Sequence, residues 1–240
     1  MELYEQQVFA ELREWKKSII TRQSVVNGLA MTVQAGINKM IPDRVHDMVT
    51  RAIRQMTKTV IFGARLTTSP AKHEESLSAI ETNVRRKIDF YSKTAAAEGA
   101  VTGYGGILLG LVDLPLWLSI KIKMLFEIAS LYGHDLSDYK ERIYLLHVFQ
   151  LTFSSSKQRQ DIFNQMKKWN NEKEKLPVNL DQFDWRTFQL EYRDYLDLPK
   201  LMQLIPGFGA LVGFYVNQRL TRKLGNYAMN AYRMRRFKIS

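Results

Sequence analysis

The 240-residue chain contains no cysteine, and its first residues lack the apolar core of a signal peptide. The missing cysteines exclude a disulfide framework and thiolate metal sites, and their absence is compatible with a reducing compartment. The N-terminal sequence MELYEQQVFAELREW is acidic and amphipathic, which does not fit export through a cleaved signal. We therefore expect the bulk of the chain to be cytoplasmic.

Motifs of the common enzyme classes are also missing. No glycine precedes a Lys-Ser or Lys-Thr pair, so there is no P-loop, and a G-x-S-x-G serine nucleophile is absent. The glycines at 103–106 begin a dinucleotide fingerprint, but Leu108 stands where its third glycine belongs. None of the four histidines has metal-site spacing, and the apolar neighbours of His147 favour a core or interface position. We predict a non-enzymatic protein without cofactor or metal.

Acidic residues stop at Asp197, although the chain as a whole carries a net charge of +11. Beyond that point all charges are basic, and such a block favours an anionic surface, either phospholipid or nucleic acid. The predicted contact residues are Arg219, Arg222, Lys223, Arg233, Arg235, Arg236 and Lys238.

Helical periodicity runs through nearly the whole sequence. The first repeat is Val8, Leu12, Trp15 and Ile19, and similar repeats follow at 26–40, 45–60, 77–91, 143–153, 162–169 and 183–195. Gly133 is expected to end one helix, and Asp138 with Glu141 has the spacing of a capping box. No alternating strand pattern and no clear linker occurs. The sequence predicts an all-α protein with one domain, 1–240.

One run, 99–120, is apolar except for Asp113 and is rich in glycine. At ~100° per residue, four glycines form a narrow stripe on a helix, with Asp113 at its edge. Each glycine costs ~1 kcal/mol in a helix relative to alanine, so an aligned set indicates close approach of another backbone. The alternative interpretation is a glycine loop. The stripe consists of Gly99, Gly103, Gly106 and Gly110.

A second apolar run, 198–218, has only one charge and presents Gly209, Gly213 and Asn217 four residues apart. Two faces with few side chains can approach more closely than leucine faces. We therefore predict that the two glycine-rich runs pack together. Asp113 and Pro115 also predict a helix break, and Asn217 is expected to meet Asp113 or a freed carbonyl near this Asp113–Pro115 break.

Several motifs resemble the EcsC family signature, and the likeness covers essentially the whole chain. They are Ala97-Glu98-Gly99-Ala100-x-Thr102-Gly103-x-Gly105-Gly106, Asp113-Leu114-Pro115, Ile128-Ala129-x-Leu131-Tyr132-Gly133 and Pro206-x-x-Gly209-x-x-x-Gly213-x-x-x-Asn217. In Gram-positive bacteria the family includes a protein encoded beside an ABC transporter linked to secretion and competence. The resemblance implies a role near the membrane, with transporter subunits as partners, and it supplies no catalytic residues.

Both apolar runs are long enough to cross a bilayer, but Asp113 and Pro115 disfavour spanning, and the mean hydropathy is −0.26. The preferred interpretation is an accessory or regulatory protein, peripheral or shallowly inserted at the inner face of the cell membrane. Two alternatives remain at this point. One is a soluble helical protein whose basic end binds nucleic acid, and the other is an uncharacterised hydrolase.

Overall fold

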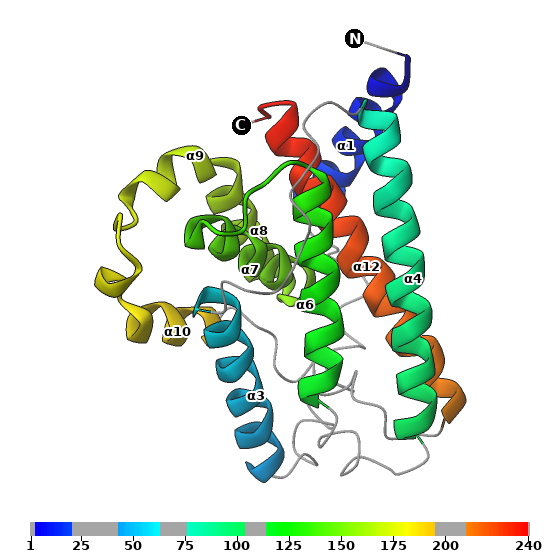
Figure 1. The fold of residues 1–240 in the computed structure, drawn as a ribbon, viewed down its shortest axis with the longest axis vertical. Helices are drawn as coiled ribbons and strands as arrows, with labels where there is room; N and C mark the ends of the chain where they lie inside the picture. The colour runs from blue at the N-terminus through cyan, green and yellow to red at the C-terminus, as the bar shows by residue number, and fades with distance from the viewer. Residues whose placement is uncertain (1–2, 21–42, 63–75, 104–113, 195–209, 240) are drawn as a thin grey trace.

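The computed structural model describes residues 3–20, 43–62, 76–103, 114–194 and 210–239. These residues form helices joined by turns, and no strand occurs within them (Figure 1), which confirms the all-α prediction. The α-helices are α1 (Leu3–Ile20), α3 (Asp43–Phe62), α4 (Leu77–Gly103), α6 (Leu114–Leu131), α7 (Tyr139–Phe153), α8 (Ser156–Lys167), α9 (Trp169–Glu172), α10 (Trp185–Asp194) and α12 (Ala210–Arg236). Two short 3₁₀ helices, Lys173–Lys175 and Leu180–Gln182, lie between α9 and α10.

The longest helices, α4 and α12, lie antiparallel and form the most extensive helix–helix contact of the described chain (Figure 1). Each has 27 residues and is therefore about 40 Å long. The side chain of Ile88 on α4 packs onto α12 at Gly225, where an added Cβ would lie 2.5 Å from Cγ1 of Ile88. This glycine makes room for a side chain, and it lies outside the predicted glycine stripes.

Helix α6 covers the α4–α12 pair, and α7 connects that pair to α3 and α8. Most of α7 is buried, including its polar residues Glu141, Arg142 and Gln150. Arg142 donates to the carbonyl of Ile61 at distances of 3.0 Å from Nε and 2.7 Å from Nη2. The guanidinium thus satisfies a carbonyl in the last turn of α3, where helical partners are missing.

Local signals in the sequence set several helix ends. Gly133 follows α6 with a φ of 86°, the left-handed conformation that stops a helix at low cost. Asp138 is the N-cap of α7, and its carboxylate accepts from the backbone N–H of Lys140. Glu141 was expected to return a capping-box bond, but its carboxylate binds Arg235 instead. The charge of a distant arginine is the stronger partner.

Candidate functional site

Three helix ends that border the two apolar runs lie together at one end of the bundle. Helix α4 ends there at Gly103, α6 begins there at Leu114, and α12 begins there at Ala210 (Figure 1, lower end). We call this end of the molecule the pole. The segments 104–113 and 195–209, which connect to it, lie outside the described residues. The pole is therefore where both glycine-rich motifs meet the described bundle.

Large apolar side chains are exposed at the pole. Leu116, in the first turn of α6, is 51% exposed, and Phe214 and Tyr215, near the start of α12, are 42% and 61% exposed. An apolar cavity of about 130 Å³ lies between α3 and the first turns of α6. Its lining includes Met56, Val60, Pro115, Leu118 and Ile122. Exposed large apolar side chains at one end of a bundle make that end a candidate interaction surface.

Directly inside the pole, α4, α6 and α12 each contribute one polar side chain to a buried cluster. Asn217 is fully buried and donates from Nδ2 to the carbonyl of Ala95 at 2.5 Å and to Oε2 of Glu98 at 2.6 Å. Its Oδ1 accepts from Nζ of Lys121 at 2.8 Å. The amide thus joins a carboxylate on α4 to an ammonium on α6, and we call Glu98, Lys121 and Asn217 the polar trio.

The chemistry of the trio depends on Lys121, which has no exposed surface. Burial lowers the pKa of its ammonium to about 7, although the charge of Glu98 acts in the opposite direction. The ammonium also lies 3.8 Å from the centroid of the Trp117 ring, which stabilises the charged form through a cation–π interaction. Near neutral pH the trio can therefore hold or release a proton inside the bundle.

The glycine-stripe residues fall on both sides of the described boundary. Gly99 and Gly103 belong to the last turns of α4, and Gly213 belongs to the first turns of α12. Asn217 lies on the α4 side of α12, but its described partners are Ala95, Glu98 and Lys121 rather than the expected break after Asp113. The remaining predicted residues lie outside the described part of the chain; they are Gly106, Gly110, Asp113 and Gly209.

The basic residues of the C-terminal block do not form one surface. Arg233 was expected to contact an anionic surface, but it is 1% exposed and pairs with Glu81 through Nε at 2.7 Å and Nη2 at 2.6 Å. Arg235 is mostly buried and binds both carboxylate oxygens of Glu141. For these two residues the prediction is wrong, because carboxylates distant in sequence neutralise them inside the fold.

The other basic residues of the block keep exposure but are spread along α12. Arg219 and Arg222 are exposed, and Arg222 pairs with Asp89 at 3.0 Å. Lys223 is partly buried and donates to the carbonyl of Thr152. Arg236 and Lys238 are exposed at the opposite end of α12 from the pole (Figure 1). A single flat surface at the C-terminus is therefore not present.

Sequence reasoning missed Lys121 and Trp117 as members of a site. A signal was available, because Lys121 follows Trp117 by four residues and precedes Leu125 by four, which places it on the apolar face of α6. A lysine on an apolar helix face is expected to be buried, and a buried lysine needs a polar partner from elsewhere in the fold. In the described chain no three His, Asp or Glu side chains are arranged to hold a metal ion. No described helix has the length and hydropathy needed to cross a bilayer.

Comparison of the sequence with known proteins shows the family of the chain. The model of the EcsC protein family matches residues 6–237. The chain belongs to the EcsC protein family. Protein EcsC of Bacillus subtilis (strain 168) is 41% identical over 232 residues, which are 96% of this chain and 95% of the relative. The uncharacterized protein YdbA of the same organism is 30% identical over 145 residues, 60% of this chain and 53% of that protein.

No solved structure matches the chain. The EcsC-family match includes every described helix in whole or in large part, so the pole and the polar trio belong to the matched region. Two of the trio, Glu98 and Asn217, also lie in the motifs that suggested the family from the sequence. The third, Lys121, lies between those motifs in sequence and donates to Asn217.

Proposed function

We propose that this EcsC-family protein is a membrane-associated, non-enzymatic accessory or regulatory protein that acts at or near an ABC transporter. The observation that carries the membrane part is the exposure of Leu116, Phe214 and Tyr215 at the pole. Both apolar runs of the sequence connect to the helix ends at that pole. In this proposal the pole lies against the inner face of the cell membrane.

Estimated magnitudes favour peripheral or shallow binding. Burying a large apolar side chain completely contributes about 1.5–3 kcal/mol, and the three side chains at the pole are only partly exposed. Arg219 is exposed on the same half of α12 and adds ~1 kcal/mol near an anionic lipid surface. The sum is enough for reversible attachment, and the two apolar runs would strengthen it.

Flotation with liposomes tests the proposal. The triple variant Leu116→Ser, Phe214→Ser, Tyr215→Ser should lose most of its binding to vesicles that contain anionic lipid. A matched control replaces three exposed apolar residues away from the pole, Leu3, Phe90 and Val178, by serine. The control should float like the unaltered protein, and equal loss in both triple variants would sink the proposed orientation.

The transporter part rests on membership of the EcsC family and on the resemblance described above. Its test is chemical cross-linking in native membranes, followed by capture of the tagged ABC-transporter subunits. We expect more cross-links from Lys123, midway along α6, than from Lys175 on the α9–α10 connection, because α6 begins at the pole. Cross-links distributed evenly over the surface, or none to the transporter, would count against this part.

The nucleic-acid alternative loses its main support in the structure. It depended on a continuous basic C-terminal end, whereas Arg233 and Arg235 are committed to Glu81 and Glu141. Tyr232, one of the aromatics that could have stacked on bases, is 1% exposed.

A further inference from the structure

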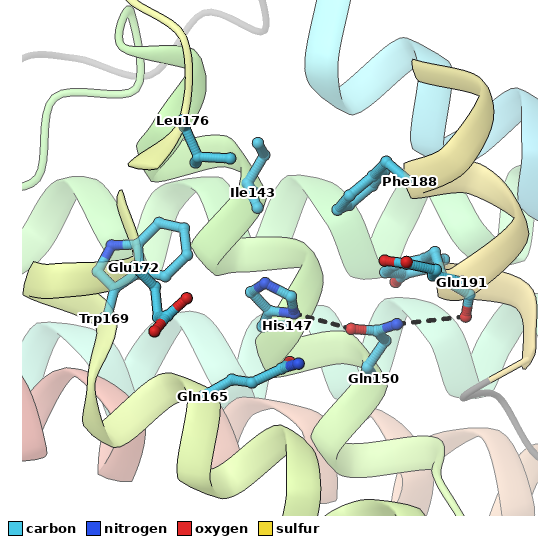
Figure 2. Close-up of a pocket in the computed structure, with 10 residues that line it drawn as sticks. Ile143, His147, Gln150, Gln165, Trp169, Glu172, Leu176, Phe188 and Glu191 are labelled. Carbon is cyan, nitrogen blue, oxygen red and sulfur yellow. Dashed lines mark hydrogen bonds between the residues drawn. The ribbon is translucent and has the colours of Figure 1, made fainter. Parts of the chain in front are cut away.

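A cavity of about 220 Å³ lies between α7, α8, α9 and α10, on the far side of α7 from the α4–α12 pair (Figures 1 and 2). Its lining combines acceptor groups with aromatic faces, and none of the described residues that line it is Lys or Arg. Among these lining residues the carboxylates are those of Glu172, which pairs with Lys175, and Glu191. The polar and aromatic lining residues are His147, Gln150, Gln165, Trp169, Glu172, Phe188, Glu191 and Tyr192.

Hydrogen bonds fix the tautomer of His147. The carbonyl of Tyr192 can only accept, so it receives the N–H of Nε2 of Gln150 at 3.2 Å. The other end of the same amide, Oε1, must then accept from Nδ1 of His147 at 2.8 Å. The second ring nitrogen of His147, its own Nε2, therefore carries a lone pair. This nitrogen is an acceptor on the cavity wall (Figure 2). Burial lowers the pKa of His147, which keeps the ring neutral.

The support behind this acceptor is rigid. The hydroxyl of Tyr192 donates to the carbonyl of Leu146 at 3.1 Å, so the residue that holds Gln150 is itself anchored to α7. Trp169 and Phe188 pack edge-on to the imidazole, with ring centroids 5.7 Å and 6.5 Å away. The aromatic rings offer negative faces to a cation.

Two carboxylates flank His147 on opposite sides of the cavity. Glu172 lies on the Trp169 side and Glu191 on the Phe188 side (Figure 2). Glu172 already attracts a cation, because Nζ of the exposed Lys175 lies 2.8 Å from its Oε1. A ligand with one positive end would satisfy only one of these groups, whereas a ligand with two separated positive ends would satisfy both.

We propose that this cavity binds a small aliphatic diamine or short polyamine. One ammonium lies near Glu172 and the other near Glu191, and the hydrocarbon between them contacts the aromatic walls. Nε2 of His147 accepts an N–H from the ligand. The volume fits this ligand class, because clefts for drug-sized molecules are larger, at about 300–1,000 Å³. The inference is independent of the membrane role proposed above.

Isothermal titration calorimetry on the full chain at pH 7.5 tests the site with 1,4-diaminobutane and spermidine as probes. We expect saturable binding at one site, and 1-aminobutane should bind at least tenfold more weakly. Glu172→Gln and Glu191→Gln should each weaken diamine binding by about tenfold, because each removes a charge-assisted hydrogen bond to the ligand. Thermal melts of each variant verify that it is folded.

The matched control is Glu174→Gln, which removes an exposed carboxylate from the same connection without touching the cavity lining. Its affinity for the diamine should stay within twofold of the unaltered protein. The proposal is overturned if no probe binds saturably, if the monoamine binds as tightly as the diamine, or if the control loses as much affinity as Glu191→Gln. Because the assay contains no lipid, its outcome is separate from that of the flotation experiment.

Discussion

Two buried cations, Arg233 on α12 and Lys121 on α6, contact the α4–α12 pair at different ends of the bundle, and their surroundings differ. Arg233, far from the pole, makes a two-point ion pair with Glu81 and a further bond to Glu11 at 3.0 Å. Lys121, just inside the pole, donates to the neutral amide of Asn217. The pKa of the arginine is raised, whereas that of the lysine is lowered to about 7.

The difference lies in what replaces water around each charge. Burial alone would raise the pKa of Glu81, but hydrogen bonds from Arg233 and Tyr4 outweigh it, and the pKa of this carboxyl is lowered. The planar guanidinium fork matches both carboxylate oxygens, which a single ammonium cannot do. Arg233 therefore stays charged, and we call the end of the bundle that contains Arg233 and Glu81 the locked end. At the pole, Lys121 can lose its charge near neutral pH.

The largest expected effect comes from removing the carboxylate at the locked end. Glu81→Gln leaves Arg233 buried beside a neutral amide, and breaking a buried pair in this way costs about 3–5 kcal/mol of unfolding free energy. Urea denaturation at pH 7 measures it. Glu14→Gln, which breaks the exposed pair with Lys17, is the control and should cost less than about 1 kcal/mol. Similar losses of unfolding free energy in the two variants would show that the buried pair contributes no more than the exposed one.

The polar trio should show itself as a pH dependence of stability. The folded pKa of Lys121 is about 7 and its ordinary value is 10.5, so between these values the unfolded chain binds more protons. Its contribution to the unfolding free energy therefore rises with pH from about 7 toward 10.5, by at most ~1.4 kcal/mol per pH unit.

Lys121→Met should remove this rise, which urea denaturation at pH 7, 8 and 9 can measure. Lys123→Met is the control, because Lys123 is exposed on the same helix two residues away. Titrations elsewhere in the chain cancel when the slopes are compared. Parallel slopes for Lys121→Met and the unaltered protein would show that Lys121 is charged throughout this range, and the two buried cations would then be alike.

The smallest effect is expected for the exposed charges at the locked end. Arg236→Gln with Lys238→Gln should change the unfolding free energy by no more than about 0.5 kcal/mol, since both side chains are exposed. Flotation on anionic vesicles should also change little, because these residues lie at the opposite end of α12 from the pole. A loss of flotation larger than that of Arg219→Gln would move the membrane surface to the locked end.

Local patterns predicted the parts of the fold that neighbouring residues decide. The repeat of Val8, Leu12 and Ile19 is buried as expected, because a helical period places these side chains on one face. Gly133 and Asp138 end and begin helices for reasons of backbone conformation and hydrogen bonding that act within a few residues. The assignment to the EcsC family also followed from sequence motifs alone. The single-domain interpretation stays a prediction.

The partners of the charges depended on the tertiary structure. Arg233 and Arg235 look like surface residues in sequence, and only the packing of α12 brings them to Glu81, 152 residues away, and Glu141, 94 residues away. Lys121, Asn217 and Glu98 likewise come from three helices. A local pattern shows which face of a helix is apolar, but it does not show which polar group another helix brings to that face. The sequence therefore determined the helices and the family, whereas only the packed bundle decided which charges are locked, which can titrate, and where the cavity lies.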